Sequence, residues 1–229
     1  MAAYAGQLSA ARTFGQKQRD AAQRLGFKEA VAGEYSQEAS IEAIFADKAR
    51  AIEDVTQALK LSQSPNVVLN CATALALAGE NSRAAKLADD VAQKRPYDTL
   101  VQFVEVPLVK AQIELNQGNS AKAIDLLDGA LVYARANSGV LYVRGNAYLK
   151  AGRGADAVQA FQRLQDLKNI INIDPVMPLA KLGLARAYVI ADDKARARVA
   201  YQDFLALWKD ADPNVPLLRE VKAEYARLQ

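Results

Sequence analysis

The sequence predicts an all-α solenoid built from stacked pairs of short helices, and three observations support this prediction. First, residues 141–164 have the pattern of two helices around a tight turn at residues 151–154. Second, small residues stand where those helices must touch, Gly145 in one and Ala157 in the other. Third, alanines equivalent to Ala157 recur at intervals of about 33 to 40 residues, which indicates repeated helix pairs. They are Ala51, Ala84, Ala123 and Ala197.

We expect a single domain over residues 1–229, with its elements in a fixed order. A half repeat covers residues 7–25, helix pairs cover about 28–61, 66–95, 98–136, 138–167 and 177–208, and a capping helix covers 215–228. Glycine provides the turn in most pairs, because it adopts left-handed backbone conformations without strain. Ala46-Asp47 replaces that glycine in the first pair, and Asp192 replaces it in the last, where aspartate tolerates the same conformation. The longer alanine intervals coincide with the loop-rich stretches 94–99 and 168–178.

Three local features depart from the regular pattern. Residues 8–25 have the pattern of a second helix, so we expect the chain to begin inside a repeat and to be a piece of a longer protein. Pro107 lies within the first helix of the third pair, where it predicts a kink or a late helix start. At the C-terminal end, Leu218, Val221 and Tyr225 fall on one face of an amphipathic helix, as expected of the polar cap of a solenoid.

Composition excludes several classes of function. The formal net charge is +3 and the basic residues are spread along the chain, so we expect no nucleic-acid partner. The chain has no histidine, which excludes Ser-His-Asp and Cys-His catalysis. Its one cysteine, Cys71, lies in an apolar helical pattern, where a thiol usually serves as a small buried hydrophobe. We expect no cofactor, no metal site and no catalytic activity in these residues.

The sequence also lacks signals for a membrane location. No run of about 18 apolar residues exists, so we expect no membrane span. The first fifteen or so residues lack the basic and apolar regions of a signal peptide. These observations suggest a cytoplasmic location, or one that the segment itself does not define.

The helix–turn–helix unit and the alanine interval resemble the tetratricopeptide repeat (TPR), whose period is about 34 residues. The resemblance covers about Ala32–Phe204. It implies a right-handed α-solenoid whose concave groove binds a protein or peptide.

Several segments resemble, more narrowly, the C-terminal TPR arrays of large bacterial serine/threonine protein kinases. They are RPYDTLVQ, IELNQGNSAKAIDLL, YVRGNAYL, LGLARAY, AYQDFLALWKDAD and AEYARLQ. In that family a kinase domain precedes the helical repeats. The present chain has neither a His-Arg-Asp nor an Asp-Phe-Gly motif, so the resemblance places any kinase activity in an upstream part.

Some patterns look like ligand sites but have a structural interpretation that we favour. Residues 152–157 fit the G-x-G-x-x-A fingerprint of dinucleotide binding, which needs a preceding strand that the sequence does not predict. Acidic pairs such as Asp89-Asp90 and Asp192-Asp193 do not face each other on a helix, and in turns they usually cap helices. The basic cluster of Lys194, Arg196 and Arg198 is typical of a solvated helix face.

In TPR arrays the first helix of each pair lines the groove, and the resemblance places ten residues of this chain there. They are Ser36, Ser40, Leu69, Thr73, Leu108, Gln112, Tyr142, Asn146, Leu182 and Arg186. Tyr142 offers stacking, Asn146 offers amide hydrogen bonds and Arg186 offers a carboxylate contact. The alternative is that some of the ten only pack the inner face. One TPR subclass clamps terminal carboxylates with a lysine at the position of Tyr142, so we do not expect that ligand.

The sequence therefore predicts a non-catalytic interaction module that binds an extended or helical peptide in its concave groove. Two alternatives stay open. One is the regulatory or substrate-recruiting region of a kinase whose catalytic domain lies upstream. The other is self-association through the exposed face of the unpaired N-terminal helix.

Overall fold

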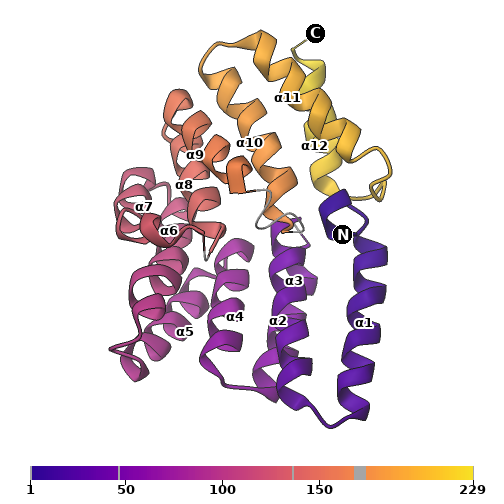
Figure 1. Ribbon diagram of the computed structural model, residues 1–229, viewed down its shortest axis with the longest axis vertical. Helices are drawn as coiled ribbons and strands as arrows, with labels where there is room; N and C mark the ends of the chain where they lie inside the picture. Colours follow the sequence, from indigo (N-terminus) through magenta and orange to yellow (C-terminus); the bar gives the residue numbers. More distant parts are fainter. Residues whose placement is uncertain (1, 46, 136, 168–173, 229) are drawn as a thin grey trace. The chain divides into compact units, whose positions relative to one another are not determined.

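Every regular element in the described part of the chain is helical. The computed structural model describes residues 2–45, 47–135, 137–167 and 174–228 (Figure 1). The predicted all-α fold of stacked helix pairs is therefore confirmed. Two predicted features, the turn residue Ala46 and the loop stretch 168–173, lie outside the described residues. Among the described residues, no helix combines the length and the apolar character that crossing a bilayer requires.

The chain forms two compact units, which we name the N-terminal and the C-terminal unit. The N-terminal unit comprises Ser9–Asn116, and the C-terminal unit comprises Gln117–Gln229 together with Met1–Leu8. The helices of the N-terminal unit are α1 (Leu8–Arg24), α2 (Lys28–Ile44), α3 (Lys48–Leu61), α4 (Pro65–Ala78), α5 (Asn81–Lys94), η2 (Val101–Glu105) and α6 (Val106–Asn116). The C-terminal unit contains η1 (Ala3–Ala5), α7 (Ser120–Leu126), η3 (Gly129–Tyr133), α8 (Gly139–Lys150), α9 (Gly154–Asp166), α10 (Val176–Ile190), α11 (Lys194–Leu207) and α12 (Pro216–Ala226).

Left-handed residues form the tight turns between paired helices, as the sequence predicts. Gly79, Gly118 and Gly152 have φ values of 90°, 86° and 70°. Asp192 has a φ of 56° and is the only residue other than glycine with a positive φ in the described ranges. Aspartate tolerates this conformation because its short polar side chain can hydrogen-bond locally. The predicted substitution of Asp192 for a turn glycine is therefore confirmed.

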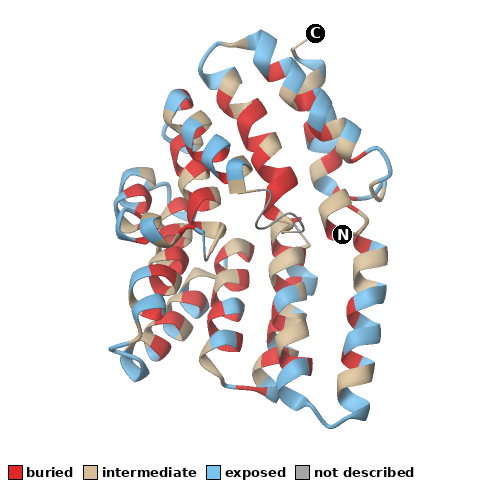
Figure 2. Ribbon diagram, viewed as in Figure 1, coloured by how far each residue is buried: buried red, intermediate tan, exposed pale blue. Residues whose placement is uncertain are grey.

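The repeated alanines lie at helix contacts. Each is buried on the second helix of its pair: Ala51, Ala84, Ala123, Ala157 and Ala197. In the C-terminal unit, Phe161 of α9 fills the space beside Gly145 of α8 and Gly183 of α10. A Cβ atom on Gly145 or Gly183 would lie 2.6 Å or 2.5 Å from atoms of the Phe161 ring. Most of α10 is buried, as Figure 2 shows.

The sequence predicted a kink or a late helix start at Pro107, and the late start is not observed, because helical residues run without a break from Thr99 to Asn116. The α-helix α6 begins at Val106, and the preceding turn, Val101–Glu105, is π-helical. Pro107 therefore follows a π-helical irregularity inside a continuous helix, which is a site where helices bend, because proline lacks the N–H that the regular hydrogen-bond ladder uses. The second helix expected after Gly118 is shorter than the pattern suggests: α7 ends at Leu126, and a 3₁₀ helix follows at Gly129–Tyr133.

The C-terminal unit also binds the N-terminal residues of the chain. The Trp208 indole N–H donates to the Tyr4 carbonyl at 3.1 Å, and the Asp212 N–H donates to the Gly6 carbonyl at 3.1 Å. A Cβ atom on Gly6 would lie 2.7 Å from the Ala211 Cβ, so only glycine fits this approach. In the same unit, α12 buries Leu218 and Val221, which belong to the apolar face predicted for the capping helix.

Candidate functional site

The predicted groove residues of the C-terminal unit lie on α8 and α10. Tyr142 and Asn146 are half-buried one turn apart on α8, and Asn146 hydrogen-bonds to the Tyr142 hydroxyl. The Tyr142 ring packs edge-to-face on Phe161, with the ring centroids 6.4 Å apart. Burial raises the pKa of Tyr142, so its hydroxyl keeps its proton at neutral pH. The two side chains therefore form a polar pair whose ring orientation is fixed by the core.

Arg186 of α10 is held by the capping helix α12. Its Nη2 atom lies 2.8 Å from Glu220 Oε1 and 2.8 Å from Glu224 Oε1. Its Nε atom donates to Glu224 Oε2 at 3.0 Å, which completes a bidentate pair. The Tyr201 hydroxyl donates to the same Glu224 oxygen at 2.8 Å. In this arrangement two carboxylates of the chain itself occupy the guanidinium for which the sequence predicted a ligand carboxylate.

The other predicted groove residues divide into buried and half-buried side chains. Leu69, Leu108 and Leu182 are buried, with at most 4% of each exposed, which agrees with the packing interpretation. Thr73 on α4 and Gln112 on α6 are half-buried. Gln112 Nε2 donates to the Asn116 side chain at 2.9 Å. The remaining two, Ser36 and Ser40, lie on α2, where Ser36 is buried and Ser40 half-buried, and the Asn70 amide donates to Ser36 Oγ at 3.4 Å.

A cluster of charged side chains joins α1 to α2 and α3 in the N-terminal unit. We name it the α1 cluster; its members are Arg12, Arg19, Glu34, Glu38, Glu42, Asp47 and Asp54. Arg12 Nε lies 2.6 Å from Glu42 Oε1, and Arg12 Nη2 lies 3.0 Å from Asp47 Oδ2. Arg19 pairs with Glu38, and its guanidinium stacks over the Tyr35 ring at 4.5 Å from the centroid. The five carboxylates outnumber the two guanidinium groups, so part of the negative charge is unbalanced.

Burial raises the pKa of Asp54 from its ordinary 3.8 to about 7. Repulsion from Glu38, Glu42 and Glu53 adds to this increase, and the attraction of Arg19 opposes it. The folded chain therefore binds a proton at Asp54 more tightly than the unfolded chain does. The resulting stabilisation is complete below about pH 4 and is lost as the pH rises through about 7.

We expect the stability of the N-terminal unit to fall between about pH 4 and pH 7, and the variant Asp54→Asn to flatten this dependence. Urea unfolding at a series of pH values, followed by circular dichroism, measures the effect. The matched control is Glu53→Gln, a substitution at an exposed neighbour on α3. Glu53 makes the smallest contribution to the raised pKa of Asp54, so this variant should change the pH profile far less. An Asp54→Asn profile that coincides with that of the parent chain would contradict the prediction.

The sequence interpretation missed the α1 cluster, although a signal for it is present. Leu8, Arg12, Gly15 and Arg19 follow one another at helical spacing, so two arginines lie on the face that an amphipathic helix usually reserves for apolar residues. Gly15 is part of the same arrangement, because a Cβ atom there would collide with Glu38.

The sequence patterns that look like ligand sites serve packing and helix ends in the structure. Residues 152–157 form the end of the turn after α8 and the first turn of α9, and no strand is present in the described ranges. A Cβ atom on Gly154 would lie 2.7 Å from the Ala191 backbone nitrogen, so this glycine serves close helix packing. In the basic cluster, Arg196 pairs with Asp193 at 2.6 Å, and Arg198 donates to the Leu228 carbonyl at 2.8 Å.

In a comparison with protein families, residues 108–169 and 142–216 match the tetratricopeptide repeat family. No curated protein sequence matches the chain.

Comparison with solved structures finds the same type of fold. A thermophilic TPR protein of Thermus thermophilus is 17% identical, with a TM-score of 0.56 over 84% of this chain and 98% of that one. BtubC from P. vanneervenii is 17% identical, with a TM-score of 0.52 over 91% and 94% of the two chains. Yeast Tom70 is 15% identical, with a TM-score of 0.57 over 98% of this chain and 46% of that one. At these identities the similarity is one of fold.

Proposed function

We propose that this chain, which has the tetratricopeptide repeat fold, is a non-catalytic scaffold that binds a peptide or protein partner. The Tyr142–Asn146 pair on α8 carries the proposal. Both side chains are half-buried, and the ring is oriented by Phe161, so it can receive a partner with little loss of conformational entropy. Thr73 and Gln112 are the corresponding candidates in the N-terminal unit. Arg186 supports the surface indirectly, through the position of α12.

Removing the Tyr142 side chain tests this function. A peptide array screened with the full chain identifies a ligand, and fluorescence anisotropy then measures its dissociation constant. We expect Tyr142→Ala to weaken binding at least tenfold, or about 1.4 kcal/mol, because a partly buried aromatic residue typically dominates such an interface. Asn146→Ala should weaken binding by a smaller factor. Tyr142→Phe keeps the packing on Phe161 and removes only the hydroxyl, so it separates the contribution of the hydroxyl from that of the ring.

The control for this experiment is Tyr97→Ala, because Tyr97 is 98% exposed. It should leave the dissociation constant unchanged. A folded Tyr142→Ala variant that binds as tightly as Tyr97→Ala would refute the assignment of the pair. The absence of any saturable peptide or protein ligand would refute the scaffold function itself.

The resemblance to kinase C-terminal arrays favours a second candidate function, in which the chain is the C-terminal module of a larger bacterial protein. The segment would then regulate a serine/threonine kinase domain upstream or recruit its substrates. The test is the open reading frame upstream of Met1. A glycine-rich loop and a His-Arg-Asp motif there would support this candidate, and an upstream frame without them would overturn it.

Self-association is a third candidate, and an exposed aromatic residue favours it. Phe14 on α1 is 62% exposed. Light scattering over a concentration series tests this candidate. A strict monomer at all concentrations, or the same assembly state in Phe14→Ser, would count against it.

A further inference from the structure

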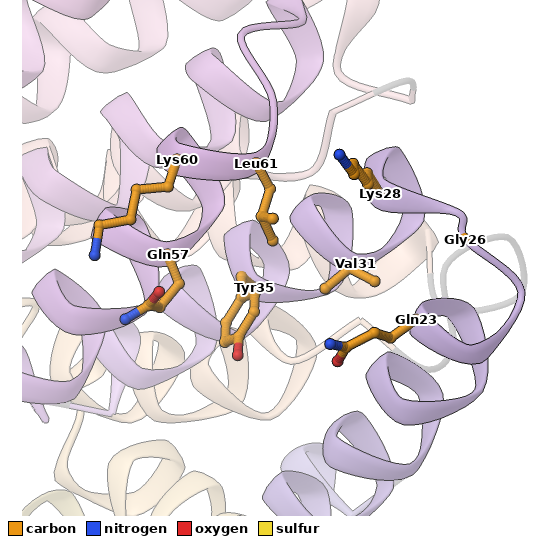
Figure 3. Close-up of a pocket in the computed structure, with 8 residues that line it drawn as sticks. All are labelled: Gln23, Gly26, Lys28, Val31, Tyr35, Gln57, Lys60 and Leu61. Atoms are coloured by element: carbon orange, nitrogen blue, oxygen red, sulfur yellow. The ribbon is translucent and has the colours of Figure 1, made fainter.

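A pocket of about 380 Å³ lies at one end of the N-terminal unit (Figure 3). The end of α1, the first half of α2 and the end of α3 form it. Val31, Tyr35 and Leu61 provide its apolar walls, and Gly26 marks the turn between α1 and α2. None of the groove residues on α4, α6, α8 or α10 lines it. The pocket is therefore a separate site from the one proposed above.

Four polar side chains of the pocket, two lysines and two glutamines, have no partner within the described part of the chain. Lys28 and Lys60 line it, and neither ammonium group forms an ion pair with a described residue. Gln23 and Gln57 place their side-chain amides at the pocket, and these amides also lack a partner among the described residues (Figure 3). No aspartate or glutamate lines the pocket, so the charged groups of its lining are the two ammonium groups.

The carboxylate nearest to Lys28 in the sequence forms a hydrogen bond away from the pocket. Glu29 follows Lys28, but the Ser64 hydroxyl donates to it at 2.5 Å. Hydrogen bonds from Ser62 and Ser64 lower the pKa of Glu29, which keeps it ionised on that side. Neither lysine has a counterion among the described residues, so both exposed ammonium groups can pair with carboxylates of a partner.

Apolar side chains continue beyond the pocket. Leu25 and Phe27 flank Gly26, and they are 67% and 58% exposed. Leu61, which is 39% exposed, belongs to both the wall and the surface. Apolar surface that is grouped in this way and bordered by charge is typical of a protein interaction site.

We propose that the pocket binds an acidic segment of a partner protein, with one large apolar side chain inserted and aspartate or glutamate residues on both sides. The inserted side chain would contact Val31, Tyr35 and Leu61. The flanking carboxylates would pair with Lys28 and Lys60, whose flexible stems reach outward from the rim. The exposed Leu25 and Phe27 favour a peptide over a small molecule, because a ligand confined to the cavity would leave both side chains uncovered.

Three fluorescein-labelled peptides test the proposal by fluorescence anisotropy with the full chain. The first, DELFEDE, has the proposed chemistry; KRLFKRK reverses its charge; DESGEDE lacks the apolar residues. We expect saturable binding of the first, at least tenfold weaker binding of the other two, and weakening of the first as salt is raised. The double variant Lys28→Glu, Lys60→Glu should weaken binding of the first peptide at least tenfold.

The matched control carries the same change of charge on α5, in the variant Lys86→Glu, Lys94→Glu. Both of these lysines are exposed and lie outside the pocket, so the affinity should change less than twofold. Equal effects of the two double variants would overturn the proposal, and so would equal binding of DELFEDE and DESGEDE. If sedimentation shows that the chain self-associates and that the peptide competes with this self-association, the acidic partner is also refuted. Tyr142→Ala should leave this binding unchanged, so failure here is distinguishable from failure of the proposed scaffold function.

Discussion

Replacing Phe161 with alanine is expected to lower the free energy of unfolding of the C-terminal unit by about 3–5 kcal/mol. The Phe161 side chain has no exposed surface, and its ring fills the space that Gly145 and Gly183 leave open on the two neighbouring helices. Removing it leaves a cavity that three helices border, and backbone atoms cannot move in to close such a gap without losing other contacts. Chemical denaturation followed by far-ultraviolet circular dichroism measures the loss.

Phe14→Ala is the control for this prediction, because Phe14 is the same residue type in an exposed position on α1. Its effect should stay within about 0.5 kcal/mol. Gly183→Ala tests the same contact from the other side: the added methyl group collides with the ring, but alanine also favours the helix by about 1 kcal/mol, so a smaller net loss is expected. Equal stability of the Phe161→Ala and Phe14→Ala variants would show that Phe161 does not hold the three helices together.

The contacts within one helix pair could be predicted from sequence because they repeat. The spacing of Gly145 and Ala157 around a glycine turn places both residues at the crossing of two helices, whatever follows in the chain. The same local rule explains why Asp192 could be identified as the left-handed residue of a turn without glycine. These features depend on neighbours within about 30 residues, which the repeat period brings together.

Contacts between distant elements could not be predicted in the same way. A helical pattern shows that Arg186 shares a face of α10 with Leu182, but it does not show that α12 places Glu220 and Glu224 against that face. The pocket at Gly26 depends on three helices, and no single sequence segment contains its pattern. The arginines of α1 were visible at helical spacing, but the acidic residues that receive them lie on α2 and α3.

Replacing Arg19 with alanine is expected to destabilise the docking of α1 by about 3–5 kcal/mol, because the change leaves buried carboxylates without a counter-charge. Arg19 is only 8% exposed, and it pairs with Glu38 beneath Gly15, where glycine leaves room for the carboxylate. Burial already raises the pKa of Glu38, so the loss of the Arg19 charge makes ionisation still more costly. Hydrogen exchange of the α1 amides should show the change most directly, since local opening then needs less free energy.

The double variant Arg19→Met, Glu38→Leu measures the net contribution of the ion pair to stability. Arg19→Ala, in contrast, measures the cost of leaving one partner unpaired. Arg19 Nε and Glu38 Oε1 are buried without a hydrogen-bond partner among the described residues, so each group is incompletely compensated for its loss of water. Apolar residues of similar volume therefore should restore most of the stability that Arg19→Ala removes. Arg24→Ala, an exposed arginine on the same helix, controls for the loss of one positive charge. Protection of α1 that is unchanged in Arg19→Ala, or reduced equally in Arg24→Ala, would mean that the buried ion pair does not hold this helix in place.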